Sequence, residues 1–156
     1  MNTIDFFKLQ SKNLHRDFKR RKPASDNADI AWSYEYEPKY FDVLLVMIDF
    51  KLDEEKLTLM KAQHAIAQMA GFEKWTALIK ASEADLKIAK ILYENQSTVD
   101  SFMWESYIAE AEEMNQTIFD SETKLAICEQ AFEMGVFGDD VYFDCYLLDG
   151  KYGMST

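Results

Sequence analysis

Apolar residues recur every three or four positions through most of this chain, a spacing that places side chains on one face of a helix. The first such stretch is residues 3–21, where Thr3 is suited to cap the helix. Its apolar face consists of Ile4, Phe7, Leu14 and Phe18. Pro23 then stops the helix, because proline lacks a backbone N–H and its ring clashes with the preceding turn. The pattern therefore predicts a first helix over residues 3–21.

The clearest helical pattern lies in residues 53–96, beginning with a helix over residues 54–70. Asp53 is suited to cap this helix, and Gly71 is suited to end it, because glycine adopts a positive φ at little cost. The apolar positions expected to face inward are Leu57, Met60, Ala65, Ile66 and Met69.

Four further helices are predicted after Gly71. The first carries Trp75 and Leu78, and the second begins after a capping Ser82. The last two cover residues 98–115 and 120–134. Their candidate caps are Thr98 or Asp100 and Asp120 or Ser121. Their apolar positions are Phe102, Met103, Tyr107, Ile108 and Ala111, then Leu125, Ile127, Cys128, Ala131 and Phe132.

For two segments near residues 30–50, the sequence pattern does not distinguish helix from strand. Residues 23–37 are predicted as a surface connection, although the alternation of Trp32, Tyr34 and Tyr36 also suits a short strand. Residues 39–51 favour a helix begun by Pro38, although their β-branched residues suit a strand equally well.

Only five Gly and two Pro interrupt the chain, and no internal repeat or long linker divides it. Residues 141–148 form either a strand or a short docked helix, and Asp149-Gly150 signals a turn. We therefore expect a mainly α fold: one domain over residues 1–156, built as a bundle of about six helices. A short strand or hairpin is expected near residues 30–50 and at the C-terminus.

The net charge of -11 is distributed unevenly. Residues 1–22 hold seven Lys/Arg and two acids, residues 23–98 hold eight and thirteen, and residues 99–156 hold two and thirteen. These sums are +5, -5 and -11. The basic head either docks on the acidic body of its own chain or forms a binding surface. The candidate interaction surface consists of Lys8, Lys12, Arg16, Lys19, Arg20 and Arg21.

Motifs for metal, cofactor or catalytic sites are absent from the sequence. His15 and His64 have no second His or Cys at ligand spacing, and Cys128 and Cys145 form no CxxC pair. No calcium loop, glycine-rich phosphate loop or nucleophile elbow occurs. The sequence therefore predicts no metal, no cofactor and no catalytic residue. An enzyme whose site is assembled from distant histidines, tyrosines and carboxylates remains an open alternative.

No apolar run reaches the roughly 20 residues that span a membrane, and the N-terminus lacks the pattern of a secretion signal. We therefore expect a cytoplasmic protein with no membrane partner and with reduced thiols in its core.

Residues 58–80 contain a combination typical of a helix–turn–helix corner. Ala67 is small enough to let a second helix approach, Gly71 takes the positive φ of the turn, and Phe72 fills the core. The complete set is Gln63, Ala67, Gly71, Phe72, Trp75 and Leu78. Reading DNA would also require donors on the second helix, which offers only two lysines. We therefore interpret the corner as structural, with DNA recognition as the alternative.

The same corner resembles a short helical segment found in many bacterial proteins. Its sequence is Ala62-Gln63-His64-Ala65-Ile66-Ala67 and then Gly71-Phe72-Glu73-Lys74-Trp75-Thr76-Ala77-Leu78, which fits A-Q-x-x-[IL]-A-x-x-x-G-[FY]-x-x-W-x-x-L. That segment occurs beside ankyrin repeats and in small glyoxalase-related proteins. The opening Ile4-Asp5-Phe6-Phe7-Lys8-Leu9-Gln10 also resembles the start of a family of small bacterial proteins of uncharacterised activity. The resemblance implies a packing role for the motif and no activity.

Together these features predict a non-enzymatic binding or regulatory protein that acts through protein–protein contacts. The first alternative is a nucleic-acid-binding regulator that uses the corner at residues 58–80 and the basic N-terminal helix. The second alternative is the enzyme with a site assembled from distant residues.

Overall fold

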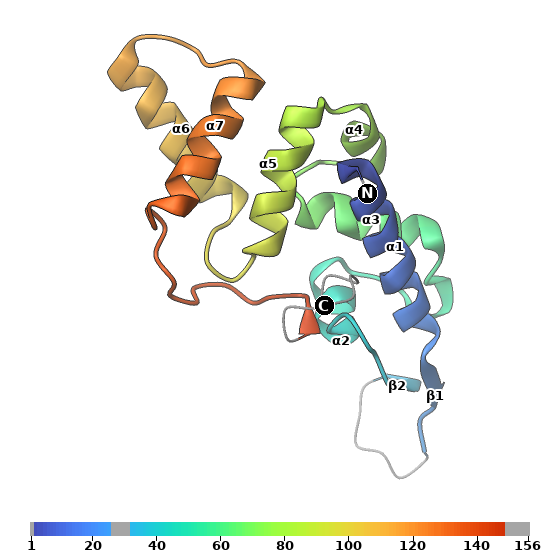
Figure 1. The fold of residues 1–156 in the computed structure, drawn as a ribbon. Coiled ribbons are helices and arrows are strands. Elements are labelled where there is room, and N and C mark those ends of the chain that lie inside the picture. Colours follow the sequence, from blue (N-terminus) through green and yellow to red (C-terminus); the bar gives the residue numbers. More distant parts are fainter. Residues whose placement is uncertain (1, 26–31, 149–156) are drawn as a thin grey trace. The chain divides into compact units, whose positions relative to one another are not determined.

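The structure of the chain, a computed structural model, describes residues 2–25 and 32–148 (Figure 1). These residues form seven α-helices, one short 3₁₀ helix and a two-stranded antiparallel sheet, which confirms the prediction of a mainly α fold. Contacts divide the chain into two compact units. Unit 1 is Met1–Gln68 with Tyr146–Thr156, and unit 2 is Met69–Cys145. The single domain expected from the sequence stays a prediction.

Unit 1 begins with helix α1, Thr3–Lys19. Asn2, rather than Thr3, is its N-cap: the Asn2 side chain accepts a hydrogen bond of 2.9 Å from the backbone N–H of Asp5. The helix also ends two residues earlier than predicted. Arg21–Pro23 form strand β1, because their backbone pairs with a second strand instead of continuing the helix.

Helix α1 is buried on a broader face than the apolar spacing predicts. Phe7, Leu14 and Phe18 are buried as expected, whereas Ile4 is only half-buried. Phe6 is buried beside Phe7, with the two ring centroids 5.2 Å apart in an edge-on arrangement. Polar residues of the same helix are buried as well: Thr3, Gln10, Ser11, Asn13 and Asp17. Because so much of α1 is enclosed, only a narrow side of the helix remains exposed.

Strand β2, Tyr34–Tyr36, pairs antiparallel with β1, so that Arg21 lies opposite Tyr36 and Pro23 lies opposite Tyr34. This pairing confirms the short strand that the aromatic alternation suggested. The sequence pattern assigned the partner strand partly to the end of the first helix, because three residues are too few to show their own periodicity.

Helix α2, Val43–Asp49, confirms the helix expected within residues 39–51 but begins later. Asp42 is the N-cap, accepting a hydrogen bond of 3.1 Å from the N–H of Leu45, so Pro38 does not begin the helix as predicted. Before it, Phe41 forms an isolated antiparallel bridge with Leu147, which brings the end of the described chain into unit 1. The predicted turn at residues 149–150 lies outside the described residues.

The helix predicted over residues 54–70 is two elements. Asp53 caps a 3₁₀ turn, Glu54–Lys56, and helix α3 is Leu59–Met69, with the Thr58 hydroxyl accepting a hydrogen bond from the N–H of Lys61. The predicted core position Met60 is 76% exposed. At the start of α3, the side of the helix that faces the core is therefore not the side that the apolar spacing predicted.

Unit 2 contains α4 (Trp75–Lys80), α5 (Glu83–Glu94), α6 (Ser101–Asn115) and α7 (Ser121–Glu133). Side-chain capping hydrogen bonds from the structure confirm Ser82, Asp100 and Asp120 as the N-caps of α5, α6 and α7.

The core of unit 2 lies where α5, α6 and α7 pack together. Its buried members are Ile88, Leu92, Val99, Trp104, Ile108 and Cys128. Phe137, after α7, adds ring contacts to Tyr107 at 5.4 Å and to Phe132 at 5.2 Å between centroids. Phe102, which the spacing placed on the apolar side of α6, is instead 76% exposed. In neither unit do the described residues form a helix long and apolar enough to cross a membrane.

Candidate functional site

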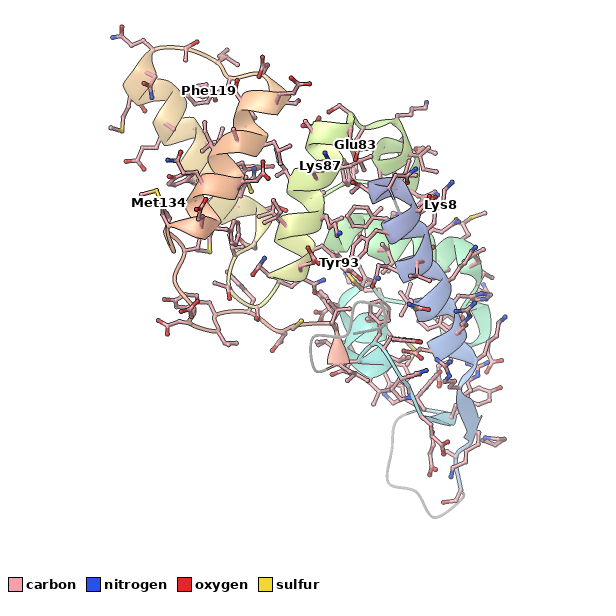
Figure 2. The ribbon with its side chains drawn as sticks, viewed as in Figure 1. Lys8, Glu83, Lys87, Tyr93, Phe119 and Met134 are labelled. Carbon is pink, nitrogen blue, oxygen red and sulfur yellow. The ribbon has the colours of Figure 1, made fainter. Side chains whose placement is uncertain are left out.

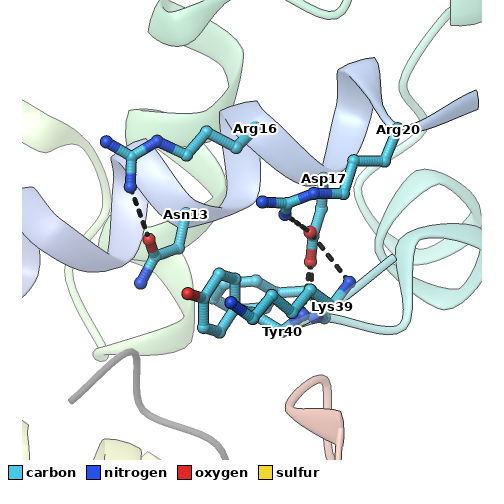
Figure 3. Close-up of polar contacts among 7 residues, drawn as sticks. Asn13, Arg16, Asp17, Arg20, Lys39 and Tyr40 are labelled. Carbon is cyan, nitrogen blue, oxygen red and sulfur yellow. Dashed lines mark hydrogen bonds and ion pairs between the residues drawn. The ribbon is translucent and has the colours of Figure 1, made fainter. Parts of the chain in front are cut away.

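The C-terminal end of α1 is fixed by the carboxylate of Asp17, which is completely buried (Figure 3). One oxygen accepts hydrogen bonds from the backbone N–H groups of Tyr40 and Phe41, at 2.7 and 2.8 Å. The other oxygen accepts a hydrogen bond of 2.9 Å from the N–H of Lys39 and pairs with the guanidinium of Arg20. Three successive N–H groups thus wrap one anion, an arrangement that satisfies a buried charge. These contacts of Asp17 with Lys39, Tyr40 and Phe41, which we call the Asp17 cradle, hold the segment before α2 against α1.

The next two cations of the chain are also engaged inside unit 1. The Arg21 guanidinium lies 3.7 Å from the ring centroid of Tyr34 and donates a hydrogen bond of 2.8 Å to the carbonyl of Glu54. Lys22 pairs across the sheet with Glu35 at 3.8 Å and with Glu37 at 3.3 Å. These side chains stabilise the β1–β2 sheet and its attachment to Glu54.

Four cations of α1 form a separate exposed strip, which we call the basic ridge: Lys8, Lys12, Arg16 and Lys19. Lys8 is seen projecting from α1 in Figure 2. Arg16 donates a hydrogen bond of 3.2 Å to the side chain of Asn13, on its own helix. In the part of the chain that the structure describes, none of the ion pairs involves a residue of the ridge.

The six cations proposed from the sequence as an interaction surface therefore divide into two groups. The four ridge residues remain available, whereas Arg20 and Arg21 are half-buried and bound within unit 1. Sequence reasoning missed this division because it assigned all six residues to one helix, and the helix ends at Lys19.

Unit 1 also contains a cavity of about 390 Å³, which we call the aromatic cavity. Its lining contains three aromatic residues, which we call the aromatic wall (Trp32, Tyr34 and Tyr36), and three aliphatic residues, Val43, Leu44 and Leu148. Glu35 and Asp42 add two carboxylates to its lining. The volume lies within the range of small-molecule sites. The sequence offered one signal for this site, the Trp–Tyr–Tyr alternation, which we interpreted as part of a surface connection or as a short strand.

The hydroxyl of Tyr36 holds this wall in place. It donates a hydrogen bond of 2.9 Å to the carboxylate of Glu54 and accepts one of 3.2 Å from Arg21. Burial, more than the neighbouring carboxylate, raises the pKa of Tyr36 to about 12. The phenol is therefore neutral at physiological pH and remains a hydrogen-bond donor.

Unit 2 has a smaller cavity of about 220 Å³ beside the predicted corner motif. Gly71 and Phe72 line it together with Trp104, and three charged residues, Asp85, Glu105 and Lys124, surround it. Gly71 has a φ of +92°, and a Cβ added there would lie 2.8 Å from the Ser101 hydroxyl. The positive φ therefore favours glycine at this position, and the Ser101 hydroxyl would have to move to make room for a Cβ.

The residues of the corner motif differ in burial, and its interpretation as a structural corner stays a prediction. Ala67 and Leu78 are fully buried, while Gln63, Phe72 and Trp75 are half-buried. The first helix of the motif belongs to unit 1 up to Gln68 and the second belongs to unit 2. That second helix, α4, has six residues and is therefore only about 9 Å long.

The histidines and cysteines do not gather into a site in the described parts of the chain. No group of three or more His, Cys, Asp or Glu side chains there is placed to hold a metal ion. His15 and His64 are not among the residues lining either of the two cavities. Burial, with a smaller effect of Lys19, lowers the pKa of His15. Cys128 is buried in the core of unit 2, and burial raises the pKa of its thiol to about 12.

Division of the chain into units also changes the charge pattern. Unit 1 holds twelve Lys/Arg and twelve Asp/Glu and is neutral, whereas unit 2 holds five and sixteen, which accounts for the whole net charge of -11. The ridge therefore belongs to the neutral unit.

Comparison of this chain with family models, with curated proteins and with solved structures found no match.

Proposed function

We propose that this is a non-enzymatic binding protein whose basic ridge docks on an acidic surface of a partner protein. The observation that carries the proposal is that the four ridge residues stay exposed on a helix whose other sides are buried. Lys8 and Lys19 are eleven residues apart, or about 16 Å along the helix, and all four side chains fall within about 80° of its circumference. A rigid strip of this kind suits a surface of matching carboxylates.

A protein partner is favoured over nucleic acid by the charges of the whole chain. Four cations are a small footprint for phosphates, and the net charge of -11 on unit 2 opposes the approach of a polyanion. The short α4 also offers little length for reading a groove. The proposal includes a cytoplasmic location, which the two free cysteines favour, because disulfides are rare in reducing compartments.

The test compares two double charge reversals in unit 1. Lys8→Glu with Lys12→Glu alters the ridge, and Lys56→Glu with Lys61→Glu makes the same change in charge at exposed positions outside it. Immobilised wild type and variants are used to capture proteins from native lysate. Any partner is then purified, and its affinity is measured between about 50 and 300 mM salt, because screening weakens contacts between exposed charges.

The expected result is a partner whose affinity falls at least tenfold in the ridge variant, falls with salt and is unchanged in the control variant. Equal binding by both variants, or no partner at any salt concentration, would contradict the proposal. A mobility shift with random duplex DNA at about 50 mM salt, lost only in the ridge variant, would replace the protein partner with nucleic acid.

A further inference from the structure

The walls of the aromatic cavity are held by contacts within unit 1, so the site does not depend on a ligand for its shape. Tyr36 is bound to Glu54 through its hydroxyl, as described above. Leu148, another lining residue, donates a backbone hydrogen bond of 2.9 Å to the carbonyl of Tyr40, and Phe41 bridges to Leu147. The cavity is therefore preformed, which lowers the entropic cost of binding.

Electrostatics give the cavity a preference for cations. Among the described residues that line it, Glu35 and Asp42 are acidic and none is Lys, Arg or His. Asp42 uses one carboxylate oxygen to cap α2. The Glu35 carboxylate lies 3.8 Å from the ammonium group of Lys22, which also pairs with Glu37, and the Glu35 side chain is 40% exposed. Lys22 partly offsets the charge of Glu35, whereas Asp42 makes no ion pair within the described residues, so an anionic ligand would meet at least one uncompensated carboxylate.

The aromatic wall adds a second attraction for cations. The face of an aromatic ring carries partial negative charge and attracts ammonium and guanidinium groups. Tyr34 already makes such a contact with Arg21, whose guanidinium lies 3.7 Å from its ring centroid. Tyr34 lines the cavity, and Arg21 does not. Trp32, the side chain with the strongest cation–π attraction, is on the same wall.

We propose that the aromatic cavity binds a small organic cation, namely a quaternary or alkylated ammonium group on an apolar body. The aromatic side chains surround the alkylated nitrogen, the aliphatic side chains take the apolar body, and Glu35 and Asp42 supply the opposite charge. This site is separate from the basic ridge, which attracts acidic surfaces, and the inference goes beyond the proposed function.

The test uses full-length protein and two probes of nearly equal shape, choline and its uncharged carbon analogue 3,3-dimethylbutan-1-ol. Binding is followed by amide chemical shifts in NMR titrations. Choline is expected to bind at least tenfold more tightly than the alcohol and to shift amides of β2 and of the first turn of α2. N-acetyl-trimethyllysine amide is a third probe, and tighter binding of this probe than of choline identifies a protein side chain as the source of the cation.

Three variants locate the site. Trp32→Ala is expected to weaken choline binding at least tenfold, because it removes an aromatic wall. Asp42→Asn is expected to weaken it several-fold while keeping the cap of α2, since asparagine caps helices as well as aspartate does. Tyr142→Ala, at an exposed aromatic position of unit 2, is the control and is expected to bind like wild type. Folding of each variant is checked by its amide spectrum.

Three results would overturn the proposal. Equal affinity for choline and the alcohol would make the cavity a neutral apolar site. Choline binding that survives Trp32→Ala in a folded protein would place the site elsewhere. No chemical shift change at tens of millimolar choline would show that the cavity does not bind this class of ligand.

Discussion

Replacing Asp17 with asparagine tests how far unit 1 depends on the buried carboxylate. Both oxygens of Asp17 accept backbone N–H groups, and one also pairs with Arg20. An asparagine in either orientation turns its NH₂ group toward at least one of these donors. Breaking a buried ion pair by removing one partner typically costs 3–5 kcal/mol, and each unsatisfied buried N–H costs about 1–3 kcal/mol. Both figures describe the loss of the same contacts and are therefore not added, so we expect the free energy of unfolding to fall by about 3–5 kcal/mol in total.

The matched control is Asp5→Asn, the same chemical change on the same helix at an exposed position. Asp5 interacts favourably with the N-terminal end of the helix dipole, so this variant is expected to lose less than about 1 kcal/mol. Urea unfolding followed by far-UV circular dichroism gives the free energy of unfolding. Hydrogen exchange at Lys39, Tyr40 and Phe41 provides the local measurement, because these amides lose their acceptor.

An Asp17→Asn variant within about 1 kcal/mol of wild type, with protected amides at residues 39–41, would refute the reasoning. The Asp17 cradle would then not be a main anchor of α1. Arg20→Gln gives a further check. The Arg20 side chain is 36% exposed, so solvent screens its pairing, and we expect a loss of only about 1 kcal/mol.

Two other predictions concern unit 2. Gly71→Ala is expected to lower the free energy of unfolding by about 1–3 kcal/mol, more than Gly135→Ala does. Both glycines have a positive φ, but only at Gly71 would the new Cβ meet a neighbouring hydroxyl. Equal losses of the two variants in urea unfolding would show that space at Gly71 is not limiting. Native protein treated with iodoacetamide at pH 8 is expected to be alkylated at Cys145 before Cys128, because Cys128 is buried and its pKa of about 12 leaves almost no thiolate. Peptide mass spectrometry measures the order, and rapid labelling of Cys128 in folded protein would contradict it.

The N-caps of α5, α6 and α7 are local features, and the sequence predicted them well. Ser82, Asp100 and Asp120 cap their helices as expected, because a capping side chain bonds to an N–H only two or three residues away. Gly71 has the positive φ that its place after α3 predicted. The mainly α character also follows from local information, since helical periodicity is repeated in every long segment.

Which faces are buried was less predictable. Met60 and Phe102 occupy apolar positions by spacing but are exposed, and the polar Gln10 and Asn13 are buried. Spacing shows that two side chains share a face, but which face is covered depends on the elements that pack against it.

The candidate sites depended on tertiary structure still more strongly. The sequence alone determined that cations cluster in residues 1–22 and that the net charge is strongly acidic. Only the fold decided that Arg20 and Arg21 bind within unit 1 while Lys8, Lys12 and Lys19 remain exposed. The aromatic cavity likewise requires Leu148 to meet β2 and the start of α2, which lie more than a hundred residues earlier in the chain. Contacts over such separations arise from folding, because no local pattern encodes which distant segment supplies the other wall of a site.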